Sequence, residues 1–177
     1  MMVPPRGPGN SENLIPFAAR KILLVLEDNP SVMMFLRLML ERYSIIEAST
    51  AEEALRFFTD HGRRIDLLIA DVTLPTSSGI QVALLLRSKI PTLPVILTCG
   101  YPVHDWSDGD LADLGRLGAN SVVILSKPFY GNALKDAVRD SMELPLFVEG
   151  QECIRSLVGG ERRFLARHRD SLKHDVV

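Results

Sequence analysis

The chain has 177 residues, a formal net charge of −2, and 46% hydrophobic and 24% charged residues. This balance is typical of a soluble globular protein and provides no basic field that would favour nucleic acid or an anionic membrane. No apolar run approaches the ~20 residues needed to cross a bilayer, and the Pro- and Gly-rich residues 1–10 lack the apolar core of a signal peptide. The two cysteines, Cys99 and Cys153, indicate neither a disulfide framework nor a zinc site. We therefore expect a cytoplasmic protein.

The regular part of the chain begins after residues 1–19, which we expect to be a flexible lead-in. The continuous apolar run Ile22–Leu26 predicts a strand that is buried on both faces, and Glu27 and Asp28 follow it directly. Asn29-Pro30 then predicts the start of a helix, because proline suits the first helical turn. The apolar stripe of this helix consists of Val32, Phe35, Leu36, Met39 and Leu40.

The alternation of strand and helix continues to residue 143. Further short apolar runs predict strands at 44–48, 67–70, 94–97 and 122–125. Amphipathic stretches predict helices after the capping box Thr50–Glu53, around 80–87, at 110–117 and at 130–142. Five buried strands that alternate with helices predict a doubly wound α/β fold over residues 20–143, with a five-stranded parallel sheet and helices on both faces.

Residues 144–177 are predicted to form a helical C-terminal extension. The spacing of the apolar residues indicates one or two short amphipathic helices interrupted at Gly159-Gly160, with the apolar positions Ile154, Leu157, Val158, Phe164, Leu165 and Leu172. The basic residues between Arg162 and Arg169 could touch nucleic acid, but a solvated helix face is the favoured interpretation. The extension is too short for a second core, so we expect it to cover the sheet domain or to bind a partner.

Polar side chains stand at or just beyond the carboxyl ends of four predicted strands, namely Glu27-Asp28, Asp71, Thr98 and Lys127. Each alone has a simpler explanation, because Asp71 could cap a helix, Thr98 could be an ordinary buried hydroxyl, and Lys127 could be a solvated lysine. In open α/β sheets, however, ligands bind outside the carboxyl ends of the strands. The four positions together therefore predict one site.

The residue types of this set predict phosphoryl transfer. Converging carboxylates remain ionised only beside a cation, and an all-oxygen set favours Mg²⁺. An aspartate can attack phosphorus to give an acyl phosphate, and such a transfer needs positioning and charge neutralisation. The Lys127 ammonium and the Thr98 hydroxyl are suited to the phosphoryl oxygens.

Four motifs in order, ILLVLEDNP, LLIADVTLPTSSG, PVILTCGY and LSKPF, resemble the receiver domain of bacterial two-component response regulators over about residues 20–143. The resemblance implies a CheY-like (flavodoxin-like) fold in which Asp71 is the phospho-acceptor. It implies Mg²⁺ ligands at Glu27, Asp28, Asp71 and the backbone carbonyl of Thr73. It also implies that Thr98 is the hydroxyl switch residue and that Lys127, which precedes a proline in a peptide that is often cis, contacts the phosphoryl group.

Three features depart from the family pattern. The first acid is Glu27 rather than Asp, and its longer side chain is expected to reach the metal through water. Ile124 occupies the position of an aromatic switch residue, three residues before Lys127. The segment from Thr98 to Lys127 is longer than usual, with an inserted loop at 101–109 that holds His104 and Trp106 as expected loop residues. Apart from these three features, Cys99 is expected to be a small core residue beside the site.

Three functions are compatible with these residues. The favoured one is a single-domain response regulator, not an enzyme, that accepts phosphate from a sensor histidine kinase or histidine phosphotransfer protein and acts on a downstream protein. The second is a pseudo-receiver, an interaction module without phosphoryl chemistry, which Glu27 and Ile124 motivate. A phosphatase with an aspartyl-phosphate intermediate is disfavoured, because Thr73 stands where such enzymes need a second Asp. The resemblance also allows a homodimer through the fourth helix, fifth strand and fifth helix.

Overall fold

The computed structural model describes residues 20–61, 64–118 and 121–143, together with the backbone of residues 153–158 and 161–166. The predicted lead-in at residues 1–19 lies outside the described residues, as do 144–152, 159–160 and 167–177 of the predicted extension. Within the described part of the chain, no helix is both long and apolar enough to span a membrane.

A parallel sheet forms the centre of the fold, as the sequence predicts. Its five predicted strands are β1 (Ile22–Leu26), β2 (Ser44–Ala48), β3 (Ile65–Asp71), β4 (Val95–Cys99) and β5 (Val122–Ser126). They lie in the order β2-β1-β3-β4-β5, and each neighbouring pair is parallel. Because sequential parallel strands need crossover connections, a helix follows each of the strands.

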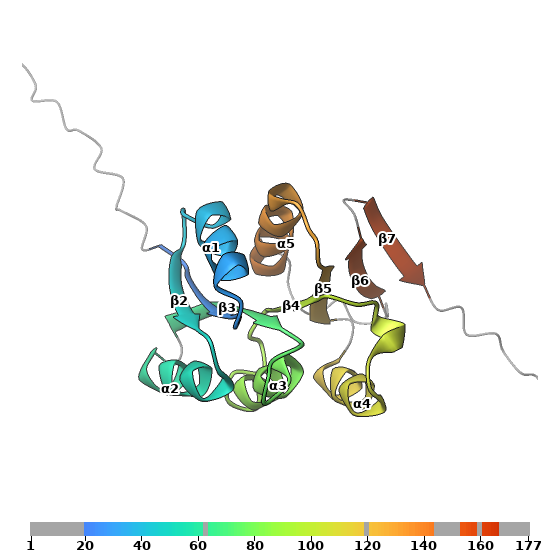
Figure 1. Ribbon diagram of the computed structural model, residues 1–177, viewed down its shortest axis with the longest axis horizontal. Helices are drawn as coiled ribbons and strands as arrows, with labels where there is room; N and C mark the ends of the chain where they lie inside the picture. Colours follow the sequence, from blue (N-terminus) through green and yellow to red (C-terminus); the bar gives the residue numbers. More distant parts are fainter. Residues whose placement is uncertain (1–19, 62–63, 119–120, 144–152, 159–160, 167–177) are drawn as a thin grey trace, which may run out of the picture.

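Helices cover both faces of the sheet (Figure 1). On one face lie α1 (Pro30–Met39) and α5 (Gly131–Glu143), and on the other lie α2 (Ala51–His61), α3 (Gly79–Lys89) and α4 (Asp108–Leu117). Successive side chains of a strand point to opposite faces, so β1 supplies Leu23 and Val25 to the core under α1 and α5, and Leu24 and Leu26 to the other core. Burial on both faces explains why the strands are continuously apolar.

Local signals in the sequence set where the helices begin. Asn29 caps α1, since its Oδ1 accepts hydrogen bonds from the backbone N–H groups of Ser31 and Val32, and Pro30 is the first helical residue. At α2, Thr50 Oγ1 accepts from the backbone N–H of Glu53, whose carboxylate accepts in turn from Ser49. This is a variant of the predicted capping box, displaced by one residue on the carboxylate side.

The prediction of a helical extension is wrong for residues 153–158 and 161–166, which add two strands to the sheet. Strand β6 (Cys153–Val158) pairs in parallel with β5, and β7 (Glu161–Ala166) pairs antiparallel with β6, so the sheet has seven strands. Two six-residue runs separated by Gly159-Gly160 are the pattern of a β-hairpin, in which a two-residue Gly-Gly connection is favoured. The free edge of β5 offers backbone N–H and C=O groups, and the segment Cys153–Val158 pairs with them as a strand.

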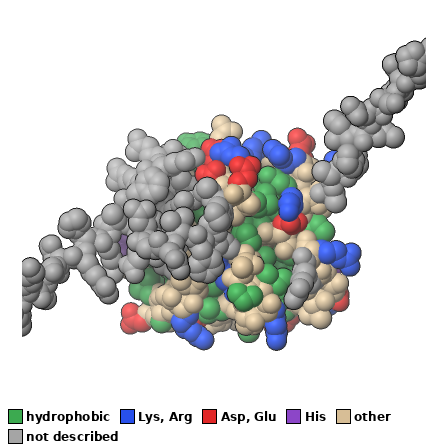
Figure 2. Space-filling model, turned by 180° about the vertical axis from the view of Figure 1, so that it is seen from behind, with side chains coloured by type: hydrophobic (Ala, Val, Ile, Leu, Met, Phe, Trp, Pro, Cys, Tyr) green, Lys and Arg blue, Asp and Glu red, His purple; other side chains and the backbone are tan. Residues whose placement is uncertain are grey.

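Charges of both signs are spread over the visible described surface of the rear face (Figure 2). Acidic and basic side chains lie close together there, with hydrophobic groups between them. This distribution agrees with the small net charge of −2.

Candidate functional site

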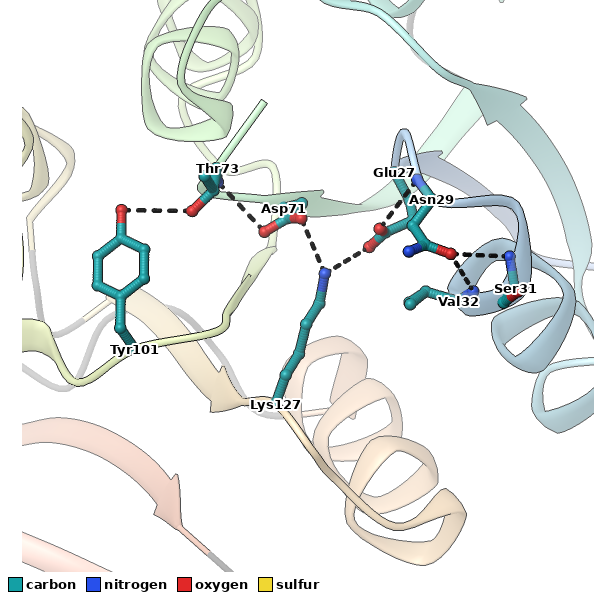
Figure 3. Close-up of polar contacts among 8 residues, drawn as sticks. All are labelled: Glu27, Asn29, Ser31, Val32, Asp71, Thr73, Tyr101 and Lys127. Atoms are coloured by element: carbon teal, nitrogen blue, oxygen red, sulfur yellow. Dashed lines mark hydrogen bonds and ion pairs between the residues drawn. The ribbon is translucent and has the colours of Figure 1, made fainter. Parts of the chain in front are cut away.

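The carboxyl ends of three strands bring oppositely charged side chains together (Figure 3). Glu27 follows β1 directly, Asp71 is the last residue of β3, and Lys127 follows β5 directly. The strand order reverses at β1, which has β2 on one side and β3 on the other. Ligand-binding crevices of doubly wound sheets open at such a reversal. The structure thus brings together three residues that the sequence singled out from positions far apart in the chain.

Lys127 joins the two carboxylates. Its Nζ donates to Asp71 Oδ2 and to Glu27 Oε2, each at 2.8 Å. The remaining oxygens accept from backbone N–H groups, Asp71 Oδ1 from Thr73 at 3.2 Å and Glu27 Oε1 from Asn29 at 3.3 Å. The side chain of Glu27 is only 1% exposed and that of Asp71 8%, against 21% for Lys127. The ammonium is therefore the neutralising group for two buried carboxylates, and the Lys127–Pro128 peptide bond is cis, as the resemblance implies.

Burial and charge act against each other on the ionisation of this group. Burial raises the pKa of the Glu27 carboxyl above its ordinary value, the negative charge of Asp71 adds to the rise, and Lys127 only partly offsets it. For Lys127, burial acts to lower the pKa, but the hydrogen bonds to Asp71 and Glu27 outweigh it, so the pKa of the ammonium is raised. Lys127 therefore stays charged throughout the physiological range, whereas the ionised form of Glu27 depends on its neighbours.

Asp28 completes an acidic group that could hold a cation. Carboxylate oxygens of Glu27, Asp28 and Asp71 all lie within 4.8 Å of one another, and Asp28 is exposed at the mouth of the site. An all-carboxylate set with access to water fits Mg²⁺, which prefers oxygen ligands and retains several waters. Both oxygens of Glu27 already accept hydrogen bonds from the protein, an arrangement that favours contact with a metal through water. The carbonyl of Thr73 stays a predicted ligand.

Thr98 lies beside Asp71 in the sheet. The register of β3 and β4 pairs the two residues, and paired residues of parallel strands point to the same face. The Thr98 side chain is 1% exposed, and its Oγ1 has no hydrogen-bond partner among the described residues. A buried hydroxyl without a partner is uncommon, so Thr98 retains a free donor next to the Asp71 carboxylate. Its role as the switch hydroxyl stays a prediction.

Cys99 is the next residue, and it is a fully buried member of the core beside the site, as predicted. Burial raises the pKa of the Cys99 thiol, while a hydrogen bond with Ser126 lowers it; the nearby Asp71 raises it further and Lys127 lowers it. The net rise keeps the thiol protonated and unreactive at neutral pH. Its carbonyl accepts from the backbone N–H of Lys127 at 2.6 Å, which helps to hold the lysine at the site.

Two aromatic residues of the inserted loop are missing from the predicted site. Tyr101 OH accepts a hydrogen bond from Thr73 Oγ1 at 3.3 Å, which links the loop to the segment that follows Asp71 (Figure 3). Trp106, expected in a loop, is only 4% exposed and belongs to the same buried cluster as Ile124 and Leu114. The isolated Trp in a polar loop could have indicated a buried anchor, because such a large apolar side chain is seldom left in water. His104 stays at the surface, where it pairs with Asp105 at 3.5 Å.

The fold and the position of the site define a class of signalling protein. The family model of the response regulator receiver domain matches residues 23–139. The chain therefore belongs to the response regulator receiver domain family, whose members act in phosphorylation-based two-component signalling. The matched range ends within α5, so the β6–β7 hairpin lies outside it.

Curated relatives share this domain. The response regulator GtcR of Aneurinibacillus migulanus is 32% identical over 126 residues, which cover 70% of this chain and 48% of GtcR. The probable transcriptional regulator ycf27 of Cyanidium caldarium is 34% identical over 119 residues, or 66% of this chain and 44% of ycf27. The chain thus spans less than half the length of these relatives.

Solved structures show the same architecture. The receiver domain of the hybrid histidine kinase CckA is 28% identical, with a TM-score of 0.55 over 69% of this chain and 99% of that domain. The signal receiver domain of an HD domain-containing protein from Pseudomonas fluorescens Pf-5 is 24% identical and agrees in fold, with a TM-score of 0.62 over 74% of this chain and 93% of that chain. These likenesses support the predicted doubly wound receiver fold.

Proposed function

We propose that this chain is a phosphorylation-dependent switch in which Asp71 accepts a phosphoryl group from a phosphohistidine. The donor would be a sensor histidine kinase or a histidine phosphotransfer protein, and output would pass to a downstream protein by direct contact. The observation that carries this proposal is the Lys127 ammonium, 2.8 Å from both Asp71 and Glu27 in a buried acidic pocket. A lysine in this position can keep its hydrogen bond to the Asp71 carboxylate, or it can donate instead to a phosphoryl group attached to that carboxylate.

The residues around Asp71 have distinct roles in the proposed transfer. A carboxylate oxygen of Asp71 attacks phosphorus, an O–P bond forms, and the P–N bond to the donor imidazole breaks, leaving the histidine to take up a proton. The Thr73 N–H, 3.2 Å from Asp71 Oδ1, orients the carboxylate. Lys127 and the Thr98 hydroxyl, which has no hydrogen-bond partner in the described part of the chain, would donate to the phosphoryl oxygens. No general base is required, because the nucleophile is already an anion.

The acidic group would hold Mg²⁺ during this reaction. Asp28 and Asp71 would contribute carboxylate oxygens, Thr73 its backbone carbonyl, and Glu27 would act through water. The bound ion would supply neutralisation of the charge on the phosphoryl oxygens, which is most of what this class of transfer needs. Asp71 and Glu27 would otherwise share only one positive charge, that of Lys127.

A small phosphodonor tests the proposal directly. The native chain is incubated with acetyl phosphate and Mg²⁺, and intact mass spectrometry should detect one added phosphoryl group. Asp71→Asn should abolish the addition. Asp66→Asn is the matched control, because Asp66 lies on the same strand but pairs with Lys21 at 2.7 Å at the opposite end. Retained labelling of Asp71→Asn, or none on the native chain, would contradict the assignment.

One observation favours the alternative of an interaction module without phosphoryl chemistry. Glu27 replaces the usual Asp, and hydrogen bonds from Lys127 and Asn29 already occupy both of its oxygens. If this arrangement cannot rearrange, the pocket would keep its internal ion pairs and bind no metal. A calorimetric titration with Mg²⁺ separates the two functions. A phosphorylation switch that binds the ion would give a saturable binding signal, whereas an interaction module without a metal site would give none.

A further inference from the structure

The hydroxyl of Tyr101 connects the loop after β4 to the loop after β3. It accepts from Thr73 Oγ1 at 3.3 Å, and the backbone N–H of the same Thr73 donates to Asp71 Oδ1. Figure 3 shows these contacts as a row from Tyr101 through Thr73 to Asp71. The Tyr101 side chain is 37% exposed, so this tether lies at the surface beside the acceptor. A long hydrogen bond in contact with water is weak and easily exchanged.

The other end of Tyr101 is held by a buried indole. Trp106 Nε1 donates to the Tyr101 carbonyl at 3.4 Å. The Trp106 ring is 4% exposed and belongs to the cluster that contains Ile124 of β5 and Leu114 and Leu117 of α4. Tyr101 therefore has one contact with the loop after β3, which follows Asp71, and another with the core beneath α4. A displacement of its ring can reach α4 through Trp106.

A phosphoryl group on Asp71 would compete for the Thr73 hydroxyl proton. It carries close to two negative charges and three strong acceptor oxygens. Hydrogen bonds to an ionised acceptor are roughly twice as strong as neutral ones, whereas the Tyr101 phenol is a neutral acceptor. Thr73 already contacts Asp71 through its N–H, and in the switch its hydroxyl would change partner by rotation of the side chain. The modified and unmodified states thus differ in whether the tether exists, which is the difference a two-state switch requires.

We propose that Tyr101 is the positioning residue that couples occupancy of Asp71 to the segment 100–107 and α4. The Tyr101–Thr73 hydrogen bond holds this segment in the unmodified state, and its loss on phosphorylation releases Trp106 and the start of α4. The inference rests on the proposed function of Asp71. It assigns to Tyr101 and Trp106 a coupling for which the buried Ile124 offers no polar group.

The single tryptophan of the sequence reports the coupling. The native chain and Tyr101→Phe are titrated with beryllofluoride, a phosphoryl mimic, in saturating Mg²⁺, with calorimetry for affinity and Trp106 fluorescence for conformation. Removing the tether should stabilise the released state, so Tyr101→Phe should bind beryllofluoride about two- to fivefold more tightly. Its Trp106 emission before titration should already be shifted towards that of the native complex, and the change on binding should be smaller.

Tyr130→Phe is the matched control, since Tyr130 is a 76% exposed tyrosine that follows Lys127-Pro128 and lies outside the tether. It should behave as the native chain in both measurements. If Tyr101→Phe has the native affinity and native fluorescence change, or binds more weakly, the coupling role is wrong while the acceptor assignment stands. If the native chain binds no beryllofluoride by calorimetry, the proposed function fails and the coupling fails with it.

Discussion

Gly79 lies directly against the backbone of Asp71. A Cβ added at Gly79 would meet the Asp71 carbonyl group, 2.9 Å from its carbon and nearer still to its oxygen. Gly79 is also the first residue of α3, and its N–H donates to the carbonyl of Val72 at 3.4 Å. The start of α3 and the end of β3 are therefore in contact through backbone alone, which only glycine permits.

Gly79→Ala should consequently destabilise the protein by about 1–3 kcal/mol, the range for overpacking, and slow phosphorylation by acetyl phosphate. Gly115→Ala provides the control, since a Cβ there meets nothing within 4 Å and Gly115 lies inside α4. That change should stabilise by about 0.5–1 kcal/mol. Urea unfolding followed by circular dichroism measures both, and equal shifts in one direction would contradict the packing argument.

Lys127→Met should destabilise the protein by about 3 kcal/mol near neutral pH, because it leaves two buried carboxylates without their cation. Glu27 already has a raised pKa from burial, and loss of Lys127 removes the main opposing influence. The native state then binds more protons than the unfolded state above pH 4.5, so stability falls as pH rises through the native pKa. The deficit of the variant should therefore be smaller at about pH 5 than at about pH 8.

Unfolding in EDTA at both pH values tests this pH dependence. Lys21→Met is the control, since Lys21 is 60% exposed and its pair with Asp66 should contribute less than about 1 kcal/mol. A Lys127→Met deficit that is equal at both pH values would show that Glu27 does not govern it.

Asp28→Asn should weaken Mg²⁺ binding by at least about tenfold, because the loss of even supporting groups around a metal has an effect of this size. Mg²⁺ should raise the thermal unfolding midpoint of the native chain by mass action, and the variant should need correspondingly more metal for the same rise. Glu52→Gln, an exposed acid in the first turn of α2, should respond as the native chain does. If the native chain, Asp28→Asn and Glu52→Gln all need the same Mg²⁺ concentration for the same rise in the unfolding midpoint, the cation binds elsewhere.

Arg87→Met should destabilise the protein by about 2 kcal/mol or more, since it leaves buried acceptors unsatisfied. The Arg87 guanidinium donates to the carbonyls of Leu93, Leu117 and Ser121 and to Ser121 Oγ, which ties α3 to the ends of α4 and β5. Burial lowers the pKa of Arg87 below its ordinary value, and the group remains charged at neutral pH. Lys89→Met, an exposed change two residues later, should alter stability by less than about 0.5 kcal/mol by the same urea unfolding measurement.

The sequence predicts the five-stranded sheet and its helices well, because each strand is a short apolar run and α1, α2, α4 and α5 each combine an apolar face with a polar one. It also predicts which charged residues gather, since Glu27, Asp71 and Lys127 all stand at or just beyond the carboxyl ends of predicted strands. The hairpin does not follow from periodicity, because Ile154, Leu157 and Val158 fit a helical spacing as well as a strand. Only the two-residue Gly159-Gly160 separation distinguishes the two structures.

The Tyr101–Thr73 contact could not be predicted for a different reason. It joins two irregular loops, whose relative position depends on backbone geometry that periodicity does not describe. The burial of Trp106 has the same origin, because a short 3₁₀ helix at Val103–Asp105 turns its ring into the core. The positions of such loop residues become known from the contacts in the structure, because the sequence pattern does not determine them.

The parallel pairing of β6 with Val123, Ile124 and Leu125 makes β5 an interior strand. The sheet therefore ends at β7, which has three charged residues, Glu161, Arg162 and Arg163, among its six. Charged residues on an edge strand discourage uncontrolled pairing with other chains, whereas β5 as an edge would present unpaired backbone N–H and C=O groups on a strand of apolar side chains. The hairpin thus gives the domain a protective border against aggregation at the strand that leads into Lys127.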